Sequence, residues 1–523
     1  MDNFTPPFTE FSLQQLPGFP YEAWSTQRDI YTVLEDQYNG TALDATTTDK
    51  TTLKKIEKYP IKINPLKGTC EKHASALFGQ NLDSLQIGGI PVRILADTSG
   101  EKDKKAAKEK GKQVEKAIKD IFMENGGGAL FVSNGITSQY LQGCVFVAAW
   151  IKEEDRIAIY APSPREFYGI PKGHDYWSLH KAWIVREIDK ETAESYGHEV
   201  RPQDTKWWYI EEWTEDRYKI SINNIALKDK DGNVIDSDNP FGFIPIVYIP
   251  HIRTNKFLGE SVITEMVKGI IRELNLRWAD AGDAVNDDSH QPIAIRNVRT
   301  NLKTVYHNGR PIIDLGSSTG LASGESNPDM ITVPLKSASD VMIKLGDSLY
   351  DMYRREVNHP AVADGEDSGS QRSSLSLGVK MWPLVAHIEL ERMFWTVGLM
   401  KFSTMLLKML EEKGYADVTK EHLKLKLKVI WAPVLPIDRK ALVDELASRS
   451  SNSLGSQQHL MEMTGDIVDV EEELEIIKAE KEAAAELAQK FAPKPAEPGG
   501  SVPLKKNSNT PNTPAPKPAA KTK

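Results

Sequence analysis

The sequence contains few of the features of a secreted, membrane-spanning or disulfide-stabilised protein. Its 523 residues include two cysteines, Cys70 and Cys144, too few for a disulfide framework and not spaced as metal ligands. The N-terminus lacks the basic and apolar segments of a signal peptide. The longest uncharged run, residues 125–151, contains polar side chains such as Asn134 and Ser138, which argues against a transmembrane helix. We therefore expect a soluble protein in a reducing, intracellular compartment.

Several enzyme motifs are also missing. The sequence has no GxxxxGK[ST] phosphate loop, no HExxH pair and no CxxC pair. The formal net charge is −9, which is unlike that of a generally basic nucleic-acid binder. We therefore expect no enzymatic activity, no cofactor and no bound metal.

One acidic cluster supports an alternative hypothesis. Asp280, Asp283, Asp287, Asp288 and His290 lie close together in the sequence, as the ligands of a metal-dependent nuclease could. Three of these aspartates, however, recur at helical i, i+3, i+7 spacing, and no second carboxylate cluster accompanies them. A solvated acidic helix face is the simpler interpretation.

The first half of the chain has the pattern of an N-terminal arm followed by an α+β domain. The arm, residues 1–50, is expected to contain one helix near residues 21–38. Leu66, Cys70, Ala74 and Leu77 share one face of a predicted helix, with Gly79 as its stop. A second helix is predicted over residues 101–125, and the glycines at 126–128 are expected to end it. Short runs of branched and aromatic residues predict strands at 90–96, 145–151, 157–160, 183–188, 207–213, 218–222 and 246–249. The segment DKDGN at 229–233 is interpreted as a hairpin turn, because a calcium loop would need a glutamate where Pro240 stands.

The central stretch predicts a long helical hairpin. Residues 259–288 have helical periodicity, residues 293–334 contain strand and turn signals, and a second helix reaches residue 357 with Val341, Leu345, Leu349 and Met352 on one side. Residues 358–371 lack periodicity and are expected to form a flexible loop. A helix interrupted by Pro383 follows. A hairpin of this size cannot bury its own apolar face, so we expect it to pack against copies of the same chain.

The C-terminal part is predicted to be mostly helical. A strand at residues 429–431 precedes a helical region over residues 439–491, with a turn at MTGD, 463–466. The last 32 residues contain six lysines and one glutamate, and their low apolar content predicts disorder.

Three segments together resemble the portal proteins of tailed bacteriophages. They are INPLKGTCEKHASALFG (63–79), NPFGFIPIV with LGES (239–247 and 258–261), and WAPVLPID with MTGDIVDVEEE (431–438 and 463–473). The resemblance lies in their order and spacing and extends over residues 25–490. One segment departs from it, because SGSQRSSLSL (368–377) replaces the Ser-Gly-x-Ala-Leu pattern that often begins the helix after the loop.

The resemblance implies an α+β, portal-like fold in a ring, usually of twelve copies. The implied regions are an N-terminal arm (1–50), an α+β wing (51–258 and 374–436), two stem helices (259–288 and 338–357), a β-containing clip (289–337), a channel loop (358–373), a helical crown (437–490) and a disordered basic tail (491–523). Such a ring forms the DNA channel at the capsid vertex for packaging and ejection, and nucleates procapsid assembly. The implied partners are double-stranded DNA, the large terminase, a head-completion adaptor, and the major capsid and scaffold proteins, with no membrane.

The implied sites follow from this assignment. The first stem helix has seven acidic and three basic residues between 260 and 288, a net charge of −4. Its acidic face either lines the channel, where it would repel DNA, or covers the outside of the ring. Candidate channel residues are Arg372, Lys380, Ser370, Gln371, Asp280, Asp283 and Asp287. Candidate docking residues for terminase and adaptor are Arg299, Lys303, Tyr306 and Arg310. The alternatives are a metal-dependent nuclease and another virion protein, such as a minor head protein.

Overall fold

The computed structural model describes two compact units, Met1–Pro436 and Ile437–Lys523. The described residues are 11–41, 46–48, 55–57, 62–79, 89–97, 104–152, 154–201, 204–228, 232, 234–289, 293–296, 303–307, 310–314, 329–332, 339–366, 374–415, 418–435, 439–464 and 470–490. Within this part of the chain no helix is long and apolar enough to cross a bilayer. The mixture of helices and sheets confirms the α+β prediction.

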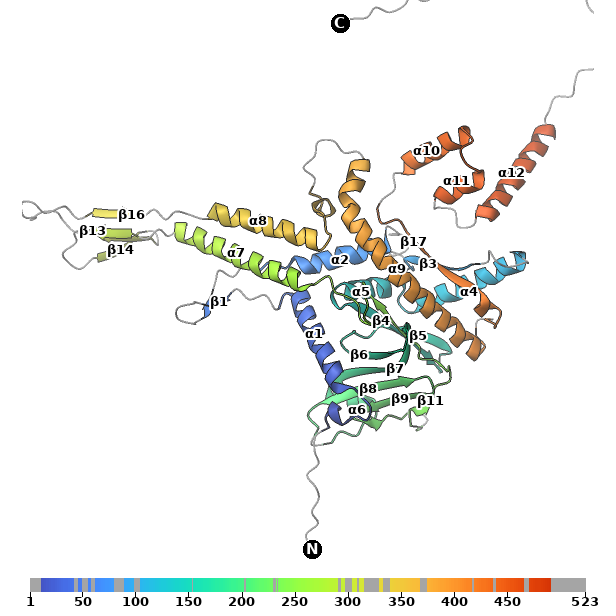
Figure 1. The fold of residues 1–523 in the computed structure, drawn as a ribbon, viewed down its shortest axis with the longest axis horizontal. Helices are drawn as coiled ribbons and strands as arrows, with labels where there is room; N and C mark the ends of the chain where they lie inside the picture. Colours follow the sequence, from blue (N-terminus) through green and yellow to red (C-terminus); the bar gives the residue numbers. More distant parts are fainter. Residues whose placement is uncertain are drawn as a thin grey trace, which may run out of the picture. The chain divides into compact units, whose positions relative to one another are not determined.

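Two antiparallel sheets form the lower part of the first unit in Figure 1. The smaller has the order β12-β4-β5, made of Ile246–Pro250, Gly143–Ile151 and Arg156–Tyr160. The larger has the order β10-β9-β8-β7-β6, with β11 also paired to β9. Its strands are β6 Phe167–Lys172, β7 Asp175–Ile188, β8 Trp207–Thr214, β9 Arg217–Ile222, β10 Ile225–Ala226 and β11 Asp236–Asp238. The predicted strands of this region are therefore confirmed, and β6, β10 and β11 are additions to them.

A third pairing joins distant parts of the sequence. Strand β3 (Val92–Asp97) pairs with β17 (Lys426–Trp431) in antiparallel register, with Ile94 opposite Val429. The predicted DKDGN turn lies almost wholly outside the described residues, although Lys228 and Val234 form an isolated bridge on either side of it. Strand β1 (Thr46–Thr48), near the end of the arm, also pairs with β2 (Lys55–Glu57), which follows the arm.

Helices on the smaller sheet enclose the main core. These are α2 (Pro65–Phe78), α4 (Lys104–Glu124), α5 (Gly127–Tyr140) and the 40-residue α9 (Ser374–Lys413). Phe78 and Trp395 meet edge to face with ring centroids 5.4 Å apart, and Phe146 lies 5.4 Å from Phe402. This aromatic packing fixes α2 and α9 on the sheet.

Local sequence explains how several helices begin and end. Helix α1 (Tyr21–Asn39) ends at Gly40, whose φ of 76° suits glycine. Asn64 caps α2 by accepting a hydrogen bond from the Leu66 amide at 3.2 Å. Asp189 does the same for α6 (Lys190–Ser195), accepting from the Thr192 amide at 2.6 Å. In α2 the predicted apolar face is fully buried.

The expectation that the glycines after residue 125 only end a helix was incomplete. Gly126, with a φ of 99°, separates α4 from α5, and Gly127 already belongs to the next helix. A Cβ on Gly135 of α5 would lie 2.7 Å from the Phe78 ring, so this glycine allows α5 to pack closely on α2.

The remaining helices and strands follow the predicted order. Helix α7 (Glu265–Ser289) and helix α8 (Ser339–Glu356) are separated in sequence by β13 (Ile293–Arg296), β14 (Lys303–His307), β15 (Arg310–Asp314) and β16 (Asp329–Thr332). The second unit contains α10 (Arg439–Ser451), α11 (Gln457–Thr464) and α12 (Val470–Lys490). The break between α10 and α11, where Ser453 has a φ of 55°, was not predicted. The basic tail lies outside the described residues.

Candidate functional site

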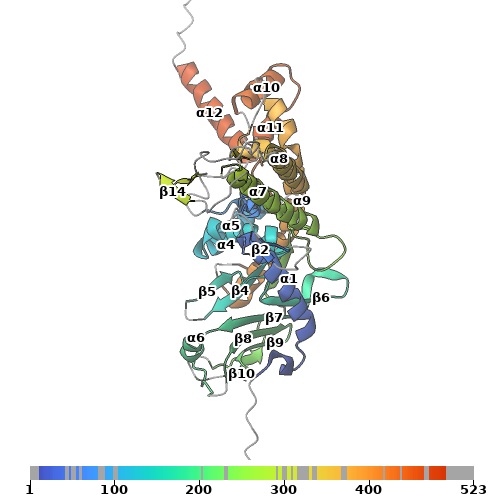
Figure 2. The same cartoon turned by 90° about the vertical axis from the view of Figure 1, so that its left-hand side faces the viewer.

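Helices α7 and α8 lie side by side, as both views show (Figures 1 and 2). Gly346 of α8 faces Trp278 of α7, and a Cβ there would come within 3.1 Å of the indole nitrogen. The buried Tyr353 of α8 donates a hydrogen bond to the Thr69 hydroxyl of α2 at 2.7 Å. The hairpin is thus held together by a close helix approach and is attached to the α+β region by a buried polar contact.

Three of the four predicted docking residues lie on one hairpin. Strands β14 and β15 pair antiparallel, with Lys303 opposite Asp314, Tyr306 opposite Pro311, and Arg310 opposite His307. Arg299 lies outside the described residues. A separate pair, β13 and β16, places Ile293 opposite Thr332. Lys303, Tyr306 and Arg310 therefore all belong to the five residue pairs that β14 and β15 form.

The acidic residues of α7 share one side of the helix. At about 100° per residue, Asp280, Asp283 and Asp287 span an arc of about 60°. Around the helix axis, exposed Glu265 falls within this arc, and buried Val267 falls on the opposite side. Arg277 donates to Asp280 at 2.8 Å, so that carboxylate is part of a surface ion pair.

This arrangement favours a solvated acidic face over a nuclease site. The part of the chain that the structure describes has one group of three or more close metal-binding side chains, and it lies elsewhere. The side chains of Asp287, Asp288 and His290 lie outside the described residues. One segment of the sequence, GSSTG at residues 316–320, has the GxSxG spacing of a nucleophile elbow. Such an elbow joins a strand to a helix, whereas the next described element here is strand β16.

The first part of the predicted flexible loop is an ordered turn. Ala361–Asp364 form a short 3₁₀ helix, and Arg354 binds both carboxylate oxygens of Glu366 at 2.7 and 2.8 Å. Asp364 receives bonds from Arg354 and Lys72 and contacts Nε2 of His359 at 2.9 Å. His359 therefore has a carboxylate partner in this turn. The hydrogen bond with Glu366 also raises the pKa of Arg354.

The other candidate channel residues follow this turn. Ser370, Gln371 and Arg372 lie outside the described residues. Lys380 lies on the exposed side of α9. Along the chain, these three candidates therefore lie between the ordered turn at residues 358–366 and Lys380 on α9.

Two helices carry exposed apolar stripes. On α8, Val341, Leu345 and Met352 are exposed by 69%, 45% and 52%, whereas the predicted stripe member Leu349 is half-buried and packs with the α7–α8 core. On α9 the stripe comprises Val379, Trp382, Leu390, Met393 and Val397, exposed by 68%, 65%, 42%, 64% and 37%. The α9 residues fall within an arc of about 80°, opposite buried Trp395. The α9 stripe was not predicted, because this helix is apolar on nearly every side and its sequence does not show which side the fold covers.

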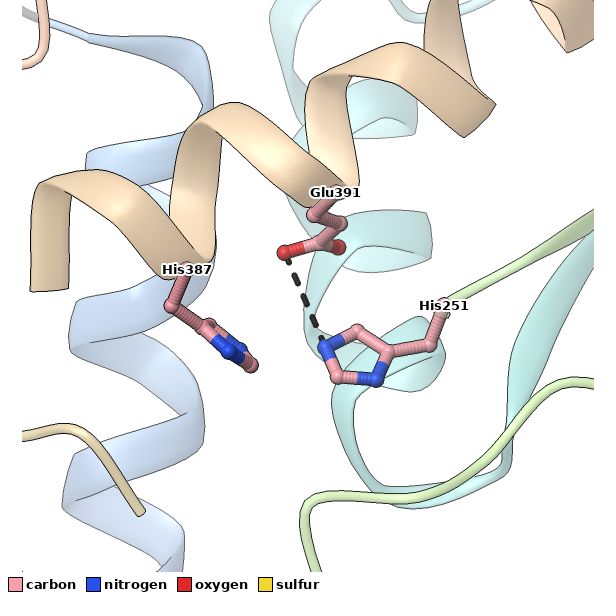
Figure 3. A group of neighbouring side chains, drawn as sticks. All are labelled: His251, His387 and Glu391. Atoms are coloured by element: carbon pink, nitrogen blue, oxygen red, sulfur yellow. Dashed lines mark ion pairs between the residues drawn. The ribbon is translucent and has the colours of Figure 1, made fainter. Parts of the chain in front are cut away.

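A buried polar cluster was also missed. His387 and Glu391 lie one turn apart on α9, and His251 follows β12 (Figure 3). Burial lowers the pKa of His251 to about 3 and that of His387 to about 4, and raises the pKa of Glu391 to about 8. The contact between His251 and Glu391 is therefore not a salt bridge at neutral pH. The i, i+4 spacing of His387 and Glu391 was the one feature of the sequence that could have indicated this buried cluster.

Comparison with known proteins identified one family. The family model described as "Phage portal protein, SPP1 Gp6-like" matches residues 139–487, two thirds of the chain. The match begins at the end of α5 and ends within α12, so it includes both sheets, the α7–α8 hairpin and α9. A search of curated proteins found no match. The family match favours the portal resemblance over a nuclease or a minor head protein.

Proposed function

This chain belongs to the SPP1 Gp6-like family of phage portal proteins, and we propose that twelve copies form a ring through which DNA enters and leaves the capsid. The observation that carries the proposal is the pair of exposed apolar stripes on α8 and α9. Contiguous exposed apolar surface of this kind marks protein–protein contacts. Because both stripes belong to helices whose opposite faces are already buried, a neighbouring copy of the chain is the proposed cover.

The proposed regions follow the elements of each unit. The wing consists of residues 51–258 and 374–436, the stem of residues 259–288 and 338–357, and the clip of residues 289–337. The crown begins at residue 437, where the division between the two compact units also falls. The channel loop is residues 358–373, which continue beyond the turn held by Arg354.

The acidic side of α7 supports a channel that DNA can slide through. Each phosphate neutralised by lysine or arginine adds salt-dependent affinity, which would slow a moving duplex. Asp280, Asp283 and Asp287 instead place negative charge on one side of the helix. In the proposed ring this side faces the channel, and Arg372 and Lys380 beside the loop make the direct contacts with DNA.

The partners are proposed from the same arrangement. The clip hairpin carries Lys303, Tyr306 and Arg310 on adjacent strands, and with Arg299 it would dock the large terminase and later a head-completion adaptor. The wing would contact the major capsid and scaffold proteins. The ring would assemble in the host cytoplasm and remain at the capsid vertex. The portal family is a structural one, and no enzymatic activity is proposed for this chain.

Electron microscopy of the purified full-length protein tests the ring directly. We expect negative-stain images of rings with a central hole, and a mass by light scattering of about twelve times 58.5 kDa. When one stripe of each copy meets a complementary surface on the next, the copies form a closed ring if the rotation between neighbours closes. A stable monomer at micromolar concentration, or an assembly without a central hole, would contradict the proposal.

Shortening the loop tests its role separately from assembly. Deletion of residues 368–373 is expected to leave the rings intact, because the stripes on α8 and α9 are untouched. It should reduce the number of DNA-filled heads in a packaging assay, since Arg372 is lost with the segment. The matched control is Lys420→Ala, which removes one exposed lysine outside the loop, keeps the loop length and should give wild-type numbers of filled heads. Normal numbers of filled heads with the deletion would remove the loop from the mechanism.

A further inference from the structure

Three metal-binding side chains converge in the interior of the first unit. His387 and Glu391 come from the same face of α9, and His251 comes from the segment between β12 and α7 (Figure 3). One donor atom from each lies within 4.8 Å of the other two. His251 is 2% exposed and Glu391 is fully buried. The cluster thus joins two segments more than 130 residues apart in the sequence.

The distance between His251 and Glu391 fits a shared ion better than a hydrogen bond. Nε2 of His251 lies 3.7 Å from the nearer oxygen of Glu391, which is too far for a hydrogen bond. Two ligands at zinc bond lengths of about 2.0–2.1 Å in a tetrahedral site lie about 3.4 Å apart. The observed separation is close to this value without any atom between the two groups.

The surrounding hydrogen bonds orient the donors toward one another. Nδ1 of His251 lies 2.8 Å from the backbone carbonyl of Glu260 and must carry the proton, because a carbonyl only accepts. This leaves the lone pair of Nε2 directed at Glu391. Gln139 donates to one carboxylate oxygen of Glu391 at 2.8 Å, and Trp395 donates to the other at 3.2 Å. Such outer contacts are the usual supports of metal ligands.

Buried nitrogen atoms without partners are a second, independent indication. Among the residues that the structure describes, Nε2 of His251, Nε2 of His387 and both ring nitrogens of His73 have no hydrogen-bond partner. The His73 and His387 rings are 5.4 Å apart. A buried polar atom without a partner costs about 1–3 kcal/mol. Several such atoms in one place suggest a ligand that the protein atoms alone do not supply.

We propose that His251, His387 and Glu391 bind a divalent transition-metal ion of the zinc class, with a water molecule as the fourth ligand. Two imidazoles and a carboxylate suit Zn²⁺, whereas Mg²⁺ and Ca²⁺ prefer sites made of oxygen alone. The ion would link α9 to the segment that leads into α7. Its role would be structural, since it would satisfy the buried donors and fix these two segments together.

Metal content and binding of the full-length protein test the site. Chelator-treated wild-type protein is expected to bind one Zn²⁺ per chain in calorimetric titration. In His251→Gln and Glu391→Gln the dissociation constant should rise at least tenfold, since each variant removes one of three protein ligands. The matched control is His198→Gln, which changes another buried histidine, remote from the cluster in sequence, and should bind Zn²⁺ as wild type does.

Cobalt spectroscopy tests the metal site in the wild-type protein, so the result does not depend on whether a variant folds. Co²⁺ added to the chelator-treated wild-type protein is expected to give the intense visible absorption of a tetrahedral nitrogen–oxygen site, and Zn²⁺ should displace it. A weak, octahedral Co²⁺ spectrum would overturn the proposal, as would the absence of Zn²⁺ binding. Unchanged affinity in folded Glu391→Gln would also overturn it.

Discussion

Replacing Leu390 and Met393 together with aspartate is expected to convert the rings into monomers without unfolding the chain. The two residues lie one turn apart in the middle of the α9 stripe, and they are 42% and 64% exposed in the isolated chain. Their replacement therefore removes little packing within the chain. Between subunits, each side chain would contribute about 1.5–3 kcal/mol when buried, and an unpaired carboxylate there would cost several more.

The same loss of interface free energy occurs at every subunit interface of a closed ring. We therefore expect light scattering to report a single-chain mass for the double variant, with a circular dichroism spectrum like that of wild type. The matched control is Val234→Asp, which places the same charge at a side chain exposed by 50% outside either stripe. That variant should still form rings. Intact rings from the double variant would show that α9 is not the subunit interface.

Elements fixed by local periodicity could be predicted from the sequence. The apolar face of α2, Leu66, Cys70, Ala74 and Leu77, is fully buried as its spacing indicates. The two hairpin helices and the strands between them were predicted for the same reason, since their signals lie within short windows. Glycine was harder to interpret. Gly126 separates two helices, whereas Gly135 allows α5 to approach Phe78, and only the tertiary packing distinguishes these uses.

The functional surfaces depended more on contacts between distant residues. The turn at residues 358–366 has no periodicity of its own, because it is held by Arg354 and Lys72 from other elements. His251 and Glu391 come together only when β12 packs against α9. The α9 stripe could not be assigned because the helix is apolar on both its buried and its exposed sides. In each case the sequence contains the residues, and the fold determines which of them meet.

Two glycine-to-alanine substitutions near the start of α7 are expected to change stability in opposite directions. A Cβ at Gly259 would lie 2.3 Å from the carbonyl oxygen of Gln142 and 3.0 Å from the backbone nitrogen of His251. These two atoms are hydrogen-bonded to each other at 3.0 Å, and the next amide, of Glu260, donates to Ile252 at 2.7 Å. No flexible side chain can move aside, so Gly259→Ala must shift the backbone that positions α7.

The expected cost of this overpacking is about 1–3 kcal/mol in the free energy of unfolding. The matched control is Gly269→Ala, inside α7, where a Cβ would meet nothing within 4 Å. Alanine there gains about 0.5–1 kcal/mol because glycine loses more backbone entropy in a helix. Thermal unfolding of the two full-length variants, followed by circular dichroism, should give melting temperatures on opposite sides of the wild-type value. An unchanged or raised melting temperature for Gly259→Ala would mean that the backbones of residues 142, 251 and 259 are not in the close contact that sets the direction of α7.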